Sequence, residues 1–217
     1  MVVVNTTPHG RLADALSAAD SSVRLRAALS AGTEPDPGLL EILIARCGVE
    51  PDFFIRDMLT WALCRLPADI TVPRLIEELD SAIAQARSQA LHTLSKIGDP
   101  RAWPPVSARV HDEDDEVARS AWRAAVALVP VGEELALATA LVPELGRGDR
   151  DRQLSLSRAF AGLGEVVLSV LDAVDTHPDP LVRAHAEATG QLVRDPESSF
   201  TLSVEVAERV VIAGPDH

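Results

Sequence analysis

The side chains with the greatest potential for chemistry are six histidines and two cysteines, which can act as metal ligands, nucleophiles or general bases. His92, His111 and His185 fall in well-separated stretches of the chain. Cys47 and Cys64 lie 17 residues apart, outside any CxxC pair or Cys/His cluster. Two such thiols supply too few ligands for a metal site, so we expect reduced, buried cysteines.

The sequence contains none of the short motifs that usually carry catalysis or nucleotide binding. GxGxxG, GxxxxGK[ST], HExxH, GxSxG and a His-Glu dipeptide are all missing. The acidic run from His111 to Glu116 could hold a cation, but acids there also favour the N-terminus of a following helix. We therefore expect a solvated turn at this run, no metal and no cofactor, and the sequence favours a protein without catalytic activity.

A repeat organises the rest of the chain. Six arginines recur at regular spacing along the chain. In four of the six cases an acidic residue stands four positions before the arginine, where its carboxylate can cap the N-terminus of a helix. Apolar residues recur one before and three, seven and ten after most of these arginines, as on one side of an amphipathic helix. We expect the arginines to make structural ion pairs and caps rather than an anion-binding row. They are Arg24, Arg56, Arg87, Arg119, Arg152 and Arg183, spaced 31 to 33 residues apart.

The stretches 85–102 and 179–183 resemble the short HEAT repeats of the phycobilin-lyase-like group. Their sequences are Gln-Ala-Arg through Ile-Gly-Asp-Pro-Arg-Ala, and Asp-Pro-Leu-Val-Arg. The resemblance covers roughly residues 9 to 195 and implies an all-α fold, a right-handed α-solenoid of about six two-helix repeats. Asp151 and Ser155 depart from it, because they stand at positions that are usually apolar.

Composition agrees with this fold class and indicates three segments. Hydrophobic residues make up 47% of the chain and aromatic residues only 3%, which suits closely packed helices better than a β-sandwich. We expect an N-terminal arm at residues 1–8, the solenoid at 9–197 and a C-terminal cap or tail at 198–217. Residues 200–212 fall outside the period; a capping helix is preferred there, and a strand or an interaction tail stays open.

Charge narrows the classes of partner. The net charge of −13 opposes binding to a phosphate backbone, so we expect no nucleic-acid partner, and a HEAT-like DNA glycosylase is disfavoured. The sequence shows neither a basic start followed by a long apolar core nor an apolar run of membrane-spanning length. A cytoplasmic protein without membrane contact, monomeric or weakly homo-oligomeric, is expected.

If the apolar stripe is buried, the positions one, two, five and nine after each arginine face outward and line a groove. This groove is polar and aromatic in the second and third repeats and small and apolar in the later ones. We expect a non-catalytic scaffold or adaptor that binds a protein or an amphipathic peptide, although Trp61 and Met58 could instead pack against the neighbouring first helix. The groove residues are Asp57, Met58, Trp61, Arg65, Ser88, Gln89, His92, Lys96, Leu128, Leu154 and His185.

The alternative is a small-molecule or chromophore-handling protein, which the resemblance to phycobilin lyases implies. It would use the apolar end of the groove, around Leu128, Leu154 and Leu192. The sequence alone leaves the identity of the partner open.

Overall fold

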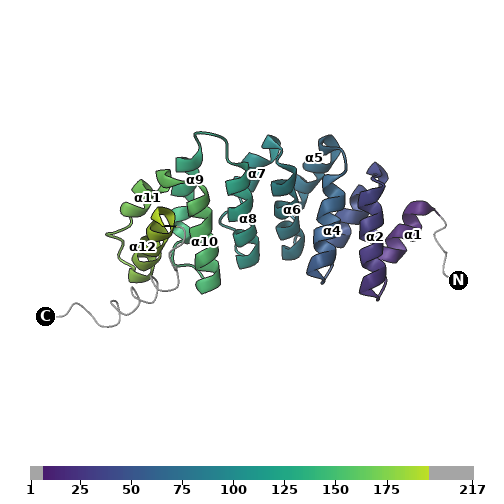
Figure 1. Cartoon of the computed structure of the whole chain (residues 1–217), viewed down its shortest axis with the longest axis horizontal. Coiled ribbons are helices and arrows are strands. Elements are labelled where there is room, and N and C mark those ends of the chain that lie inside the picture. The colour runs from purple at the N-terminus through teal and green to yellow at the C-terminus, as the bar shows by residue number, and fades with distance from the viewer. Residues whose placement is uncertain (1–6, 196–217) are drawn as a thin grey trace. The chain divides into compact units, whose positions relative to one another are not determined.

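The computed structural model describes residues 7–195, and all regular secondary structure in that range is helical (Figure 1). Twelve α-helices and four short 3-10 helices follow one another along these residues. The predicted all-α solenoid of repeated helix pairs is confirmed. Helix α1 begins at Pro8, and the predicted cap or tail at 198–217 lies outside the described residues.

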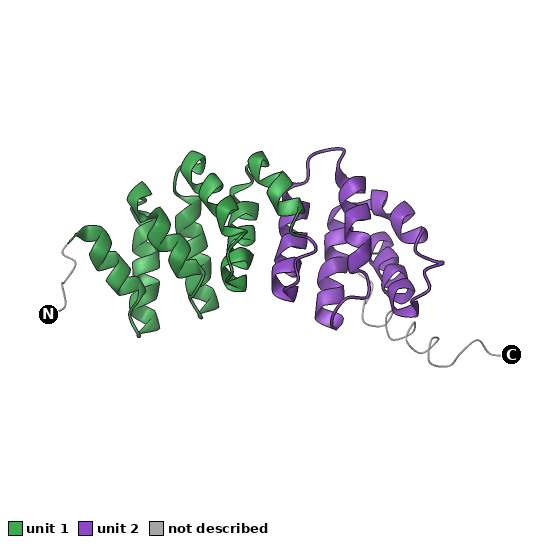
Figure 2. Cartoon of the chain, turned by 180° about the vertical axis from the view of Figure 1, so that it is seen from behind, with its two compact units in different colours: residues 1–109 green, residues 110–217 purple. Residues whose placement is uncertain are grey.

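The chain divides into two compact units, residues 1–109 and 110–217 (Figure 2). In unit 1, the helices α2, α4 and α6 lie side by side (Figure 1). The helices of unit 1 are α1 (Pro8–Leu16), α2 (Ser21–Thr33), α3 (Leu40–Cys47), α4 (Phe53–Cys64), α5 (Ala68–Glu78), α6 (Ala84–Ile97) and α7 (Trp103–Ser107).

In unit 2, the helices α8, α10 and α12 pack against one another in the same manner. Its helices are α8 (Asp115–Leu128), α9 (Glu134–Leu141), α10 (Arg150–Gly162), α11 (Leu168–Asp172) and α12 (Pro180–Arg194). The six even-numbered helices carry the repeat arginines, and each follows a shorter helix in the sequence, as the period predicts.

Acidic side chains cap five of the six arginine-bearing helices, and the exception is α6, whose N-cap is Ile83. Asp20, Asp52 and Asp179 are the N-caps of α2, α4 and α12, and each accepts a hydrogen bond from a backbone N–H of the first turn. In α8 the N-cap is Asp114, while Asp115 lies in the first turn. Because a carboxylate at this end satisfies unpaired N–H groups and meets the positive end of the helix dipole, these acids fix where each helix begins.

The repeat arginines have a second structural task, within their own repeats. The Nη1 group of Arg56 donates to the carbonyl oxygens of Glu50 and Pro51, six and five residues earlier, at 2.9 and 2.8 Å. Arg24 and Arg183 make the same pair of contacts, and Arg87 donates to the carbonyl oxygen six residues before it. A guanidinium group thus holds the turn that enters each of these helices, which confirms the predicted structural role for Arg24, Arg56, Arg87 and Arg183.

Glu50 joins two neighbouring repeats of unit 1. Its carboxylate is fully buried and accepts hydrogen bonds from Arg24, Arg46 and the backbone N–H of Asp52. Burial alone would raise its pKa, but these donors lower the pKa to about 2. Glu50 therefore stays ionised at neutral pH and links α2 to the end of α3.

Candidate functional site

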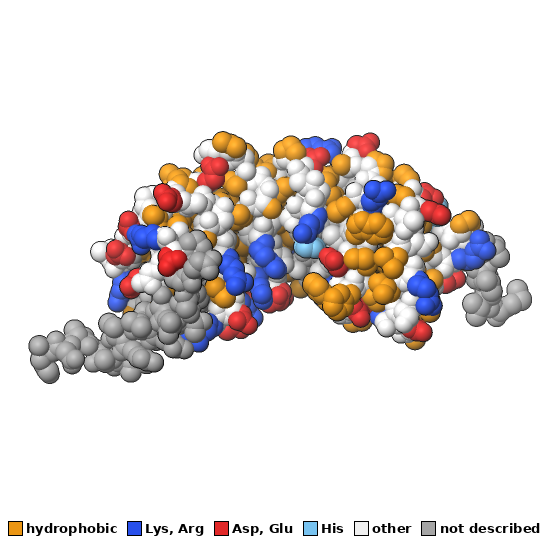
Figure 3. Space-filling view, in the orientation of Figure 1, with side chains coloured by type: hydrophobic (Ala, Val, Ile, Leu, Met, Phe, Trp, Pro, Cys, Tyr) orange, Lys and Arg blue, Asp and Glu red, His pale blue; other side chains and the backbone are white. Residues whose placement is uncertain are grey.

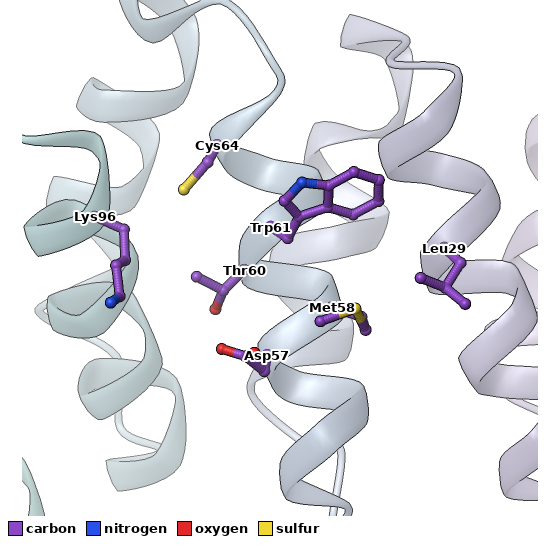
Figure 4. A pocket seen from close by; sticks show the side chains of 7 residues that line it. All are labelled: Leu29, Asp57, Met58, Thr60, Trp61, Cys64 and Lys96. Carbon is purple, nitrogen blue, oxygen red and sulfur yellow. The ribbon is translucent and has the colours of Figure 1, made fainter.

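A hollow of unit 1 lies across its second helices (Figure 4). It has a volume of about 570 Å³ and a mostly apolar lining. Helix α2 contributes one residue, α6 contributes another, and α4 contributes the rest. The lining residues are Leu29, Asp57, Met58, Thr60, Trp61, Cys64 and Lys96.

Trp61 lies between α4 and α2, and Gly32 makes its position possible. A Cβ atom placed on Gly32 would lie 2.1 Å from Cζ3 of the indole, so the ring occupies the space that a side chain would need. The indole still exposes 38% of its surface. Trp61 therefore packs against the neighbouring second helix, α2, and remains partly exposed to solvent.

Exposed apolar side chains continue from Trp61 along α4. Phe54, Met58 and Trp61 follow the i, i+4, i+7 spacing that puts residues on one side of a helix. Phe54 is 74% exposed and Phe53 is 66% exposed, and Figure 3 shows hydrophobic side chains gathered over this part of unit 1. A large aromatic residue left in water is unusual in a monomer and is typical of a binding surface.

Sequence reasoning missed Phe53 and Phe54 because it counted only positions that follow each arginine, and it missed Leu29 for a different reason. The two phenylalanines precede Arg56 in the first turn of α4. Drawing the whole helix as a wheel would have placed Phe54 beside Met58 and Trp61. Leu29, which is 39% exposed, belongs to the first repeat, for which no groove positions were proposed.

Polar groups border the apolar hollow. Nε2 of His92 lies 3.9 Å from a carboxylate oxygen of Asp57, and the buried hydroxyl groups of Thr60 and Thr93 lie 3.3 Å apart. Burial raises the pKa of the Cys64 thiol, although Lys96 acts in the opposite direction. A protonated thiol is a poor nucleophile. Cys64 is nevertheless exposed as a residue, so the expectation of two buried cysteines is wrong for Cys64 and correct for Cys47.

The predicted groove residues of unit 1 are placed close to one another. Asp57, Met58, Trp61 and Lys96 line the hollow. On α6, all three remaining groove positions are half-buried: Ser88, Gln89 and His92. Arg65 is exposed at the C-terminal end of α4.

The expectation of an open groove is wrong for unit 2. Leu128 is only 8% exposed and His185 is 1% exposed, while the half-buried Leu154 packs against Ala188. The reason is the small size of the neighbouring side chains, since Ala121 and Ala124 on α8 are also buried. Small residues let adjacent helices approach closely, and these predicted groove positions are buried as a result.

His185 lies in a closed polar network with Ser157. Its Nδ1 accepts the N–H of Gly146 at 2.9 Å, which places the proton on Nε2, near the carbonyl oxygen of Gln153 and Oγ of Ser157, both at 3.0 Å. A nitrogen that carries a proton cannot take one from serine. Burial lowers the pKa of His185 to about 4, so this pair is structural and not a catalytic dyad.

Among residues 7–195, no group of three or more His, Cys, Asp or Glu side chains is placed to hold a metal ion. In the same range, no single helix is long and apolar enough to cross a membrane. The helical segments Arg150–Gly162 and Glu165–Asp172, which are bent by 112° relative to each other, would be long and apolar enough only if they were counted as one span.

Residues 51–127 match the sequence profile of HEAT repeats. Two crystal structures of engineered proteins are similar to the chain. The first has 19% identity and a TM-score of 0.46, with 87% of this chain and 97% of that chain covered. The second has 16% identity and a TM-score of 0.45, with 87% and 99% covered. No curated protein sequence matches the chain.

Proposed function

We propose that this chain is a non-catalytic scaffold or adaptor that binds a segment of another protein at the second-helix face of unit 1. The observation that supports the proposal most strongly is the row of apolar side chains on α4, with Phe54 and Trp61 exposed and Met58 half-buried, which borders a hollow of about 570 Å³. HEAT repeats commonly serve as protein-binding surfaces, and residues 51–127, which match them, include this row.

The form of the surface favours an amphipathic helix as the bound segment. Phe54, Met58 and Trp61 lie along one side of α4 over two helical turns, so a partner helix lying along them would offer apolar residues at a similar spacing. Trp61 is the expected anchor. A half-exposed tryptophan held in place by Gly32 can bury its remaining surface without losing much side-chain freedom.

The polar residues at the border of the hollow would determine the direction in which a bound helix lies. Asp57 and Lys96 stand on different helices at the edge of the hollow, so they offer opposite charges at separate points. A partner helix with a basic residue toward Asp57 and an acidic residue toward Lys96 would match both. These rim contacts affect the rate of association and its dependence on salt more than the affinity itself.

The chromophore-handling alternative, together with membership of the phycobilin-lyase-like group, gains no support from the geometry. It required open apolar surface around Leu128, Leu154 and Leu192. Leu128 is buried and Leu154 packs against Ala188. Two of these three residues therefore offer little surface to a pigment.

The test combines site-directed crosslinking with affinity measurement. A photoreactive residue at position 58 should crosslink a polypeptide in native lysate, and Trp61→Ala in the same protein should abolish that crosslink. The captured segment, made as a peptide, should then bind wild-type protein more tightly than Trp61→Ala by about 2 kcal/mol or more.

Leu135→Ala is the matched control. Leu135 lies on α9 of unit 2 and is 45% exposed, so its removal deletes a comparable exposed apolar side chain elsewhere. The proposal fails if Leu135→Ala weakens binding as much as Trp61→Ala, or if a folded Trp61→Ala variant binds the peptide as well as wild type.

A further inference from the structure

Three arginines gather on the second-helix face of unit 2. Arg119 and Arg123 come from α8 and Arg158 from α10, and together they line a hollow of about 230 Å³. Figure 3 shows Lys and Arg side chains collected over α8 and α10. In a chain of net charge −13, such a concentration of positive charge runs against the overall balance.

These guanidinium groups have few counter-charges. Within residues 7–195, no carboxylate lies within 4 Å of the charged nitrogens of Arg123 or Arg158, and Arg119 has only a long contact of 3.7 Å with the exposed Glu116. Asp151 also lines the hollow. Three guanidinium groups thus face two nearby carboxylates, and an excess of positive charge remains.

The buried Nε of Arg119 has no hydrogen-bond acceptor among the described residues, but Arg56 and Arg152 share this property, so it is a feature of the repeat and not of the hollow. One hydroxyl group of the hollow also lacks a protein partner among those residues. Ser155 is only 8% exposed, lines the hollow, and makes no hydrogen bond through its hydroxyl within residues 7–195. Burial, with the charge of neighbouring Arg119, lowers the pKa of Arg123, which is the direction expected when like charges are held together.

We propose that Arg119, Arg123 and Arg158 form a binding site for a phosphate monoester dianion. Guanidinium groups donate in the fork geometry that phosphate oxygens accept, and three arginines with one serine hydroxyl can serve its three terminal oxygens. Val126 and Ala159 give the hollow an apolar wall, which suits the carbon side of a phosphorylated side chain or small metabolite. This site is independent of the peptide surface proposed for unit 1.

The direct test is calorimetric titration of the full chain with O-phosphoserine. Saturable one-to-one binding is expected. The double substitution Arg123→Gln, Arg158→Gln should weaken it at least tenfold, since each charge-assisted contact contributes roughly that factor. The control is Arg26→Gln, which removes an exposed arginine from α2 of the other unit and should change the affinity less than about twofold.

Competitors separate the sources of the ligand. The first competitor is a peptide whose only charged side chain is one phosphoserine. If it binds more tightly than free O-phosphoserine, the natural ligand is a phosphorylated protein. If the two bind equally, the ligand is a small phosphorylated metabolite. Glutamate, or an oligonucleotide without terminal phosphates, should compete at least tenfold less well. Equal competition by either would overturn the assignment to a monoester.

Thermal unfolding provides a readout that does not depend on calorimetry. Without ligand, the double variant should unfold at a temperature no lower than wild type, because the substitution relieves repulsion among the arginines. Added O-phosphoserine should raise the midpoint of wild type and leave that of the variant unchanged. No saturable binding by wild type, or equal weakening by Arg26→Gln, would refute the site.

Discussion

The buried carboxylate of Glu50 offers the sharpest test of how unit 1 is held together. Substituting Glu50→Gln keeps the side-chain size but removes the negative charge and places an amide NH2 toward the donors of Arg24 and Arg46. Arg24 is 7% exposed and Glu50 is fully buried, so the arginine charge cannot turn to water. Removing one partner of a buried ion pair costs about 3–5 kcal/mol, and we expect that loss in the free energy of unfolding.

Glu41→Gln is the matched control. Glu41 also receives two hydrogen bonds from one arginine, Arg74, at 3.0 and 3.1 Å. Its side chain is 66% exposed, however, and exposed pairs contribute about 0–1 kcal/mol. Both substitutions remove one arginine-paired charge, so the difference between them measures the effect of burial together with the additional donors that surround Glu50.

Urea denaturation followed by circular dichroism and tryptophan fluorescence would measure both changes. With a slope of about 1–3 kcal/mol per molar urea, Glu50→Gln should lower the midpoint by roughly 1 M or more, and Glu41→Gln by only a few tenths. The pKa of Glu50 is lowered from 4.5 to about 2. The stabilisation that the ionised carboxylate gives to the folded state is therefore complete above pH 4.5 and is lost as the pH falls toward 2. Equal costs for the two substitutions, or a gap that does not narrow in acid, would refute the reasoning.

Three further outcomes are expected. Because the pKa of His185 falls from 6.5 to about 4 in the folded chain, about 3 kcal/mol of stability should be lost as the pH falls from 6.5 to 4. Urea midpoints across that range should show this slope in wild type and not in His185→Gln. Gly32→Ala should displace the Trp61 ring and weaken peptide binding, since the added Cβ would lie 2.1 Å from the indole; fluorine NMR of 5-fluorotryptophan protein should show one shifted signal. Asp52→Ala should cost about 0.5–2 kcal/mol in thermal or urea unfolding, because the cap accepts from the N–H groups of Phe54 and Ile55.

The sequence predicts the fold because the same physical requirements recur in every repeat. A helix must begin, and Asp20, Asp52 and Asp179 mark that point as N-caps. The turn before it must satisfy its carbonyl groups, and an arginine four residues after the cap does so. Because these requirements are local, the residues that meet them recur at a fixed spacing in the sequence. A period of 31 to 33 residues is therefore enough to identify the helix pairs.

The candidate sites are less predictable because exposure depends on how closely neighbouring helices approach. The position five residues after the arginine is Trp61 in α4 and is 38% exposed, whereas in α8 it is Ala124 and is 1% exposed. Alanine at that position leaves room for the neighbouring helix to pack closely. In unit 2 the exposed side chains include Arg123 and Arg158, which the period does not single out.

The same repeat therefore presents two kinds of surface, according to the size of the side chains at a few positions. In unit 1, Trp61 occupies the space above Gly32 and holds a hollow open between α2 and α4. In unit 2, Ser157 and His185 are hydrogen-bonded in the interior, and arginines replace the apolar row outside. Since the capping acids and the turn-holding arginines stabilise the helices, the residues at outward positions can vary without loss of the fold. An apolar surface and a basic one can thus be built on one scaffold, and substitutions that abolish either should leave the other intact.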